Sequence, residues 1–252
     1  MQAIRSEFTY FLAALQVLTR LPLPSRDGFS AAWLERSVKY FPLAGVCAGA
    51  LCAAVLWICS ALWSEPLPAL LAVAAGIALT GGLHEDGLAD FFDALGGATT
   101  EARLAIMKDS RIGAYGALAL GIGIAIKVFA LAALPIPAGL GAIIAAHAGG
   151  RFTTVAVISA LPYAGGLAAA KIKPFGSGVT TADVFVAAGI AILPNLLLPW
   201  SMALAALLTG GIAAVLLAIL ARRLLGGYTG DVLGAAEQCF EIAFLLGAAA
   251  AI

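Results

Sequence analysis

Four carboxylates fall within nine consecutive residues, at Glu85, Asp86, Asp90 and Asp93. If this stretch is helical, Asp86, Asp90 and Asp93 recur at i, i+4 and i+7 and lie within a stripe of about 60°. Ligands that are all oxygen favour Mg²⁺ or Mn²⁺ over zinc. The stretch therefore predicts a divalent metal site, with catalytic and metal-binding roles for all four acids.

Glu85 lies about 100° away from that stripe. Its role stays open among contact with a second metal, action as a base and orientation of a neighbour. His84 is either a metal ligand or proton carrier, or a capping group at the start of a helix. The alternative for the whole acidic run is a solvated loop, but the glycines that flank it would allow close approach of the backbone to a ligand.

A second polar run, residues 103–116, supplies cations. The guanidinium group of Arg111 suits bidentate binding of phosphate. Metal-binding carboxylates next to phosphate-binding cations are what phosphoryl transfer requires, because that chemistry is mostly positioning and charge neutralisation. Anchoring of the next helix explains the cations equally well but leaves the acid at 109 unexplained. We predict substrate binding by Lys108, Asp109 and Arg111.

A third polar run, residues 226–234, repeats the spacing of glycines and acid found at 81–86. The repeat suggests that both segments make similar turns that face one cavity. The hydroxyl of Thr229 and the adjacent backbone N–H groups suit a phosphate. We therefore predict that Thr229, Gly230 and Asp231 bind substrate and that Asp231 adds a further metal ligand.

The composition shows which elements must position these residues. Of 252 residues, 62% are hydrophobic and 11% are charged, against roughly a quarter charged in soluble domains. The mean hydropathy is +1.03, so a soluble globular protein is excluded. We predict a single all-α domain over residues 1–252, a polytopic membrane bundle of about six to seven transmembrane helices. The expected spans are 40–63, 66–83, 113–134, 137–160, 181–200, 203–225 and the short 238–252.

The 14 basic and 14 acidic residues cancel, so no net charge favours nucleic acid as a partner. With the expected spans, the basic clusters fall on one face, which the positive-inside rule assigns to the cytoplasm. The N-terminal segment reads as a short interfacial or re-entrant helix. Lys127 and Arg151 lie within apolar spans, where a cation is costly and usually faces a polar cavity or partner. Arg151 is predicted to bind substrate, whereas Lys127 could instead snorkel to the interface.

At these motifs the chain resembles the cobalamin synthase family, the adenosylcobinamide-GDP ribazoletransferases of bacterial vitamin B12 assembly. The resemblance covers nearly the whole chain. The segments that carry it are 11–24, 40–45, 84–90, 107–113 and 227–234. One departure is in the fourth span, where a Ser-Arg pair is expected and this chain has His147 followed by two glycines and Arg151. The role of His147 therefore stays open.

The resemblance implies an integral enzyme of the bacterial inner membrane, with several spans, a cytoplasmic active site and a requirement for Mg²⁺. Its reaction would join α-ribazole, or its 5′-phosphate, to adenosylcobinamide-GDP and release GMP. The expected partners are these small molecules and membrane lipid, without nucleic acid. Whether the chain forms a homo-oligomer stays open.

Two other classes are weighed against this interpretation. A CDP-alcohol phosphotransferase shares part of the Asp-rich signature, but its pattern has an Arg after Ala where this chain has Asp90. A transporter would be expected to carry polar groups at mid-membrane and on both faces. Here almost every acid lies at one edge of the spans, which favours the transferase.

Overall fold

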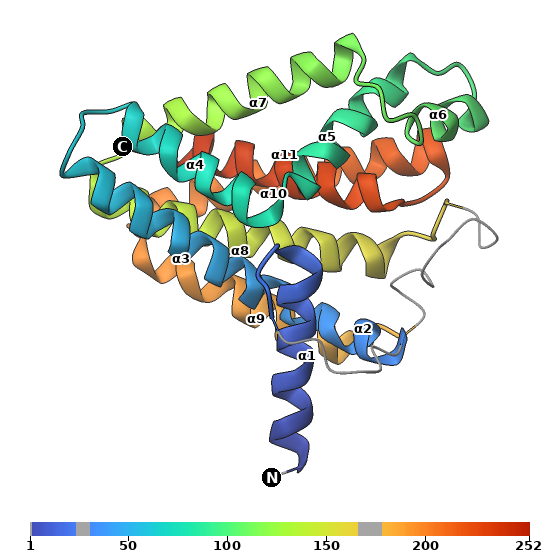
Figure 1. Cartoon of the computed structure of the whole chain (residues 1–252), viewed down its shortest axis with the longest axis horizontal. Coiled ribbons are helices and arrows are strands. Elements are labelled where there is room, and N and C mark those ends of the chain that lie inside the picture. The colour runs from blue at the N-terminus through green and yellow to red at the C-terminus, as the bar shows by residue number, and fades with distance from the viewer. Residues whose placement is uncertain (1, 24–30, 166–177) are drawn as a thin grey trace.

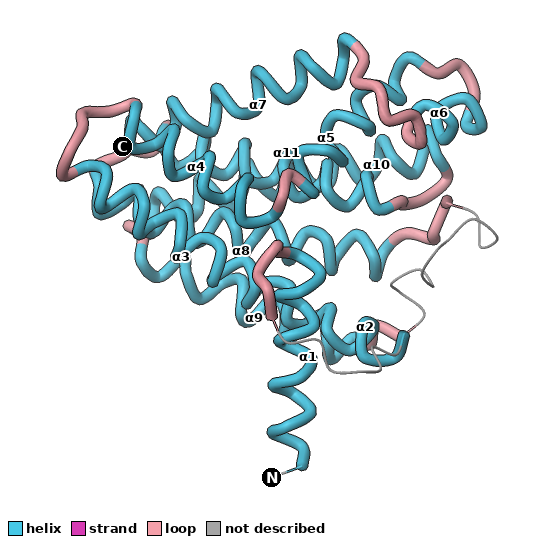
Figure 2. The backbone as a smooth tube through the Cα atoms, viewed as in Figure 1, coloured by secondary structure: helices cyan, strands magenta, loops and turns pink. Residues whose placement is uncertain are grey.

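The computed structural model describes residues 2–23, 31–165 and 178–252, and most of these residues are helical. Figure 2 shows the helices joined by short loops, and the described part contains no β-strand, only an isolated bridge between Tyr163 and Tyr228. The all-α fold class is confirmed. The α-helices are α1 (Gln2–Leu18), α2 (Ala31–Ser37), α3 (Phe41–Ser60), α4 (Leu67–Thr80), α5 (Leu83–Asp93), α6 (Thr100–Ile106), α7 (Ala114–Ala133), α8 (Ile136–Ala160), α9 (Thr181–Ile192), α10 (Trp200–Leu225) and α11 (Gly230–Ala249); the 3₁₀ helices are η1 (Val38–Tyr40), η2 (Ala94–Gly96) and η3 (Leu193–Leu197).

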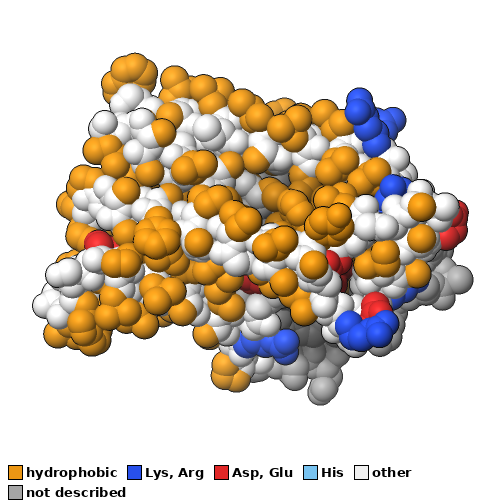
Figure 3. Space-filling model, turned by 90° about the horizontal axis from the view of Figure 1, so that it is seen from above, with side chains coloured by type: hydrophobic (Ala, Val, Ile, Leu, Met, Phe, Trp, Pro, Cys, Tyr) orange, Lys and Arg blue, Asp and Glu red, His pale blue; other side chains and the backbone are white. Residues whose placement is uncertain are grey.

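Within the described residues, five helical segments are long and apolar enough to cross a membrane, and α4 with the bent helix after it makes a sixth if the pair is one span. A polytopic membrane protein is thus confirmed, at the lower end of the predicted number of spans. Apolar side chains cover much of the face shown in Figure 3, and most charged ones gather toward the end where α5 and α6 lie. The five segments are Trp33–Ser60, Ala114–Ala133, Ile136–Ala160, Trp200–Leu225 and Gly230–Ala249.

Three predicted spans differ from the structure, and the one at 66–83 contains α4, whose 14 residues make a span only together with the bent helix after it. At the predicted span 181–200 the apolar helix is shorter and covers Thr181–Leu197, within which α9 gives way to a 3₁₀ helix that contains Pro194. Proline has no N–H to continue the α-helical hydrogen bonds. The last span begins at Gly230 rather than at 238 and contains 20 residues. Polar residues near its start are helical because they find partners inside the bundle.

Helix α11 lies at the centre of the bundle. It packs against α5, α7, α8 and α10, and Figure 1 shows it between α7 and α8. In the most apolar windows, 83% of α8 and 72% of α11 are buried, against 22% of α10. Helices α8 and α11 therefore form the interior, whereas α10 turns most of its apolar side chains outward, as a lipid-facing helix does.

Helix α1 extends away from the bundle, with the N-terminus at its far end (Figure 1). Its helical conformation agrees with the prediction, and its place relative to a membrane interface stays a prediction. The amide of Arg20, just after α1, donates to the carbonyl of Leu79 at 2.7 Å. This bond fastens the end of α1 to the end of α4 and brings Arg20 to the start of α5.

Candidate active site

Two glycines separate α4 from α5. Gly81 and Gly82 have φ values of 68° and 72°, in the left-handed region that glycine adopts without steric cost. The chain turns by 90° between the two helices, and α5 then contains the whole acidic run, as the sequence predicted. Glu85 and Asp86 lie in its first turn, where the partial positive charge of a helix N-terminus favours carboxylates.

The start of α5 packs directly against the start of α11. A Cβ atom built on Gly87 would lie 2.7 Å from the carbonyl oxygen of Asp231 and 3.2 Å from the Cα of Gly234. The carboxylates of Asp86 and Asp231 are close enough to repel each other. The two glycine-acid motifs found in the sequence are therefore helix starts that lie side by side.

The contact of Gly87 with α11 can be tested by mutation, because it is the contact that brings Asp86 and Asp231 together. Gly87→Ala is expected to push α5 and α11 apart and to destabilise the protein by about 1–3 kcal/mol, the usual cost of overpacking. Gly121→Ala is the matched control, because a Cβ on Gly121 of α7 meets nothing within 4 Å. Thermal unfolding in one detergent should show a loss of several degrees for Gly87→Ala alone. Equal melting temperatures for the two variants would contradict the close crossing.

A polar cavity of about 670 Å³ opens beside α5. One wall carries acids from α5, and cations come from the segment after α6 and from the segment after α1. Opposite charges that line one cavity suit a phosphorylated ligand and a bound cation together. The charged lining residues are Arg20, Glu85, Asp86, Asp90, Lys108, Asp109 and Arg111.

Within this cavity Asp109 and Arg111 form an ion pair. The guanidinium of Arg111 donates to Asp109 Oδ2 at 2.6 Å, and the backbone amide of Arg111 donates to Oδ1 at 3.1 Å. These hydrogen bonds lower the pKa of Asp109 to about 2, so the acid stays ionised at physiological pH. Asp109 therefore orients Arg111. Lys108 and Arg20 are exposed on the same cavity, and Arg20 was not among the residues predicted for the site.

Asp93, the last acid of the run, is turned toward α7. Its Oδ2 accepts from the amide of Gly113 at 2.7 Å and its Oδ1 from the amide of Gly116 at 2.8 Å. Both carboxylate oxygens thus satisfy free N–H groups at the start of α7, which a helix N-terminus always leaves. Asp93 does not line the polar cavity, and its predicted catalytic and metal roles stay predictions.

Of the described residues, no three His, Cys, Asp or Glu side chains are gathered so that they could hold a metal ion by themselves. Asp86 and Asp90 lie one helical turn apart on the cavity wall. Mg²⁺ is commonly held by one or two carboxylates together with substrate phosphates and water. The donor set therefore fits a Mg²⁺ that is shared with a phosphorylated substrate. Metal binding by Glu85, Asp93 and Asp231 stays a prediction.

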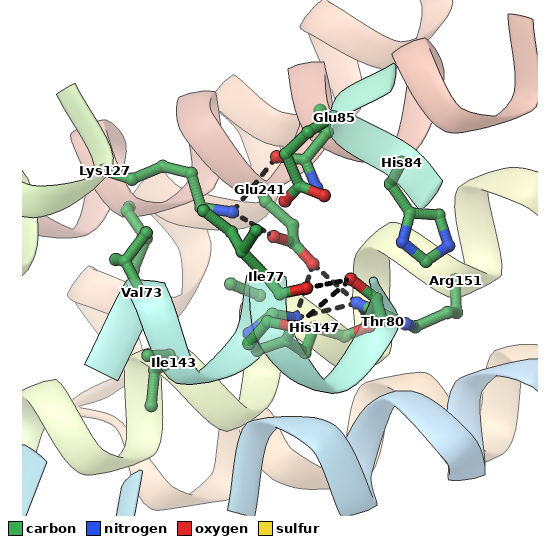
Figure 4. Close-up of a pocket in the computed structure, with 14 residues that line it drawn as sticks. Val73, Ile77, Thr80, His84, Glu85, Lys127, Ile143, His147, Arg151 and Glu241 are labelled. Atoms are coloured by element: carbon green, nitrogen blue, oxygen red, sulfur yellow. Dashed lines mark hydrogen bonds and ion pairs between the residues drawn. The ribbon is translucent and has the colours of Figure 1, made fainter. Parts of the chain in front are cut away.

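A buried network of charges lies beneath the acidic helix (Figure 4). Glu241 of α11 accepts from Lys127 Nζ at 2.6 Å and from Arg151 Nη1 at 2.6 Å, and His147 Nδ1 lies 2.7 Å from it. Arg151 is only 1% exposed and is absent from the polar cavity. The structure thus gives His147 and Lys127 a partner, and it does not bring Arg151 to the other predicted phosphate-binding residues.

The network reaches α5 through a second buried acid. Glu237 Oε1 lies 2.8 Å from Arg151 Nη1, and Glu237 Oε2 lies 2.9 Å from His84 Nε2. Sequence reasoning missed Glu237, which fell just outside the last expected span at 238–252, and also Glu241, which fell inside it. The available signal was the pair of acids four residues apart in an apolar stretch, opposite two intramembrane cations that needed partners.

The residues of the third polar run, 226–234, have two different roles in the structure: one caps a helix, and others line a second cavity. Thr229 Oγ1 accepts from the amide of Val232 at 3.3 Å, so Thr229 caps α11. Gly230 and Asp231 line an apolar cavity on which Asp86 also lies. Asp86 is therefore the acid that lines both cavities. Thr229 itself is buried, with 7% of its surface exposed.

A family model described as cobalamin-5-phosphate synthase matches residues 10–249. The chain belongs to this family. The match spans the acidic helix, both cavities and the buried network, and it confirms the resemblance seen in the sequence motifs. Membership in the cobalamin-5-phosphate synthase family leaves the CDP-alcohol phosphotransferase and transporter interpretations without support. No solved structure matches the chain.

Curated members of the cobalamin-5-phosphate synthase family carry the name adenosylcobinamide-GDP ribazoletransferase. The protein of Leptothrix cholodnii is 41% identical over 98% of this chain and 97% of its own length. The protein of Shewanella baltica strain OS155 is 39% identical, and that of Shewanella frigidimarina is 35% identical, each over 94% of this chain and 92% of its own length. The similarity therefore extends over essentially the whole length of these relatives.

Proposed function

We propose that this chain joins α-ribazole, or its 5′-phosphate, to adenosylcobinamide-GDP, forming adenosylcobalamin or its phosphate and releasing GMP. Family membership and the names of the relatives support this activity. The structural observation that carries the proposal is the polar cavity, where acids of α5 lie with Lys108 and Arg111. That charge arrangement suits a pyrophosphate and its exchange reaction.

The proposed reaction replaces one phosphorus–oxygen bond by another. A hydroxyl of ribazole attacks the phosphorus attached to the cobinamide arm, and the bond from that phosphorus to the bridging oxygen breaks, so that oxygen leaves with GMP. The hydroxyl proton passes to a base. Because the 5′ oxygen of ribazole phosphate already carries a phosphate, the attacking hydroxyl common to both substrates is one on the ribose ring.

The residues of the polar cavity divide this chemistry between them. Lys108 and Arg111 bind the pyrophosphate, and Asp86 and Asp90 hold Mg²⁺, which when bound supplies charge neutralisation to the phosphates and the leaving group. Glu85 is our candidate base. Its Oε2 is buried with no hydrogen-bond partner among the described residues, although Glu85 also lines the polar cavity. Because no hydrogen bond among the described residues holds this buried oxygen, we expect the Glu85 side chain to turn it toward a hydroxyl bound in the polar cavity and to accept the proton there.

We place the enzyme in the bacterial inner membrane as a single catalytic unit, with the polar cavity on the cytoplasmic side. The positive-inside rule supports this orientation. The short turn between α3 and α4 contains Glu65 and no Lys or Arg. The cations at the charged end are Arg20, Arg103, Lys108, Arg111, Arg222 and Arg223.

Turnover of the purified protein tests the proposed function. With adenosylcobinamide-GDP and α-ribazole, we expect GMP release with one cobalamin product formed per GMP. Chelation of divalent cations should abolish it, and added Mg²⁺ should restore it without a change in melting temperature. In sealed vesicles, external substrates should react only when the vesicles are inverted. A folded, metal-loaded sample that releases no GMP would overturn the proposal, and reaction in right-side-out vesicles would overturn the orientation.

A further inference from the structure

A second, apolar cavity of about 440 Å³ adjoins the polar cavity at Asp86. Leu83 and Asp86 line both cavities, so the two spaces meet at the first turn of α5. Its volume falls in the range of about 300–1,000 Å³ that is usual for sites of small ligands. The residues that shape it are mainly apolar side chains of α1, α2, α3 and α11, among them Val17, Leu18, Leu34, Phe41 and Leu233.

One polar side chain in the apolar cavity lacks a partner on one side. The side chain of His84 is 5% exposed, and its Nε2 lies 2.9 Å from Glu237 Oε2. His84 Nδ1 is buried and has no hydrogen-bond partner among the described residues. A buried polar atom without a partner is costly and needs a ligand or a water. The contact between Nε2 and Glu237 Oε2 is a close approach of a ring nitrogen to a carboxylate without hydrogen-bond geometry, and Nδ1 has no contact of this kind in the described part of the chain, so Nδ1 is the ring atom left for a ligand.

His84 also lines a small enclosed space of about 10 Å³ next to Arg151, which has room for one water molecule at most. Of the two cavities that His84 lines among the described residues, the apolar cavity is the one with room for a substrate group. A nucleoside with an apolar aromatic base has the matching chemistry, because its base suits hydrocarbon walls and its ribose hydroxyls can form a hydrogen bond with Nδ1 in either direction. The corrinoid substrate is several times larger than a nucleoside and does not fit 440 Å³.

We propose that the apolar cavity is the binding site of the nucleoside substrate, with His84 Nδ1 as the hydrogen-bond partner of a ribose hydroxyl. This proposal rests on the proposed function and assigns each substrate to its own cavity. The nucleoside lies in the apolar cavity and the pyrophosphate of the corrinoid substrate lies in the polar cavity, and Asp86 lines both. Glu237 then acts as a positioning residue, since its contact with His84 sets the orientation of the ring.

Separate KM values for the two substrates test this assignment. Val17→Trp fills the apolar cavity from α1, and Leu34→Trp fills it from α2 in case the first variant fails to fold. Both residues are partly exposed and line the cavity. We expect each variant to raise KM for α-ribazole at least tenfold and to leave KM for adenosylcobinamide-GDP within twofold. Lys108→Ala should do the reverse. Leu12→Trp, on α1 outside both cavities, is the matched control.

The outcomes separate this inference from the proposed function. A wild-type enzyme that releases no GMP would overturn both. A wild-type enzyme that turns over while folded cavity-filling variants keep their KM for α-ribazole would overturn only the nucleoside site, and would mark the apolar cavity as a place for lipid. An equal increase of both KM values, or the same increase in Leu12→Trp, would also count against it. His84→Ala should raise KM for α-ribazole as the filled variants do.

Discussion

Asp86→Asn is expected to lower turnover about 10³-fold, which is the usual loss of rate when a group that stabilises charge is removed from a preorganised site. Asp86 faces both cavities, and its side chain has no hydrogen-bond or ion-pair partner in the described part of the chain. The carboxylate therefore does little for stability, while an amide can neither neutralise a bound cation nor bind it equally well. GMP release under saturating substrates is the measurement, and the melting temperature should stay within a few degrees of wild type.

Asp90→Asn should reduce turnover by a similar factor, because Asp90 lies one turn along α5 on the same cavity. Glu101→Gln is the control, since Glu101 is an exposed acid at the start of α6 that does not line the cavity. Its turnover should equal that of wild type. If both Asp variants kept activity within tenfold of wild type, the role of the acidic stripe in holding Mg²⁺ would be refuted.

Glu241→Gln is expected to destabilise the protein by about 3–5 kcal/mol, which is typical when one partner of a buried ion pair is removed. Glu241 is 1% exposed and accepts from both Lys127 and Arg151. Without the charge of Glu241, the hydrogen bond that Lys127 keeps among the described residues is the one to the amide oxygen of Gln238 at 3.1 Å, and that neutral group does not compensate a buried ammonium as a carboxylate in direct contact does. For a chain of this size, the loss corresponds to roughly 10 °C in melting temperature.

Two variants decide whether charge pairing is the cause. Glu7→Gln removes the acid of a partly exposed pair, Glu7 with Lys39 at 2.8 Å, and should cost no more than about 1 kcal/mol. The double variant Lys127→Met with Glu241→Gln removes a cation and an anion together, and leaves Arg151 paired with Glu237. It should melt higher than Glu241→Gln alone. The loss of melting temperature in the double variant should be smaller than the sum of the losses in Lys127→Met and Glu241→Gln measured separately. Equality of the two would contradict the network.

Much of the polar cavity can be predicted from the sequence, because the patterns that indicate it lie within short segments of the chain. The acids at 85–93 stand at helical spacing, and glycines with a following acid mark the starts of two helices, so the chemistry of the polar cavity follows from residues within one or two turns. Long apolar runs identify the membrane spans in the same way. Family membership, too, is carried by these short motifs, and it agrees with the interpretation of the residues.

The contacts that local pattern could not foresee depend on which helices touch. Asp93 has the spacing of the acidic stripe, but α7 begins beside it, so its oxygens cap Gly113 and Gly116. Arg151 has the chemistry of a phosphate ligand, but α11 packs on α8 and supplies Glu237 and Glu241. Periodicity records which face a residue occupies and carries no information on the element that covers this face.

The sequence by itself thus established the membrane-embedded helical class, the acidic and basic groups of the polar cavity and the family. Packing established which of those groups meet. The crossing of α5 and α11 at Gly87 places Asp86 next to Asp231, and the approach of α1 and α2 to α5 and α11 forms the apolar cavity around His84. These contacts join residues far apart in the chain, and they exist because burial of apolar helix faces selects one arrangement of the bundle.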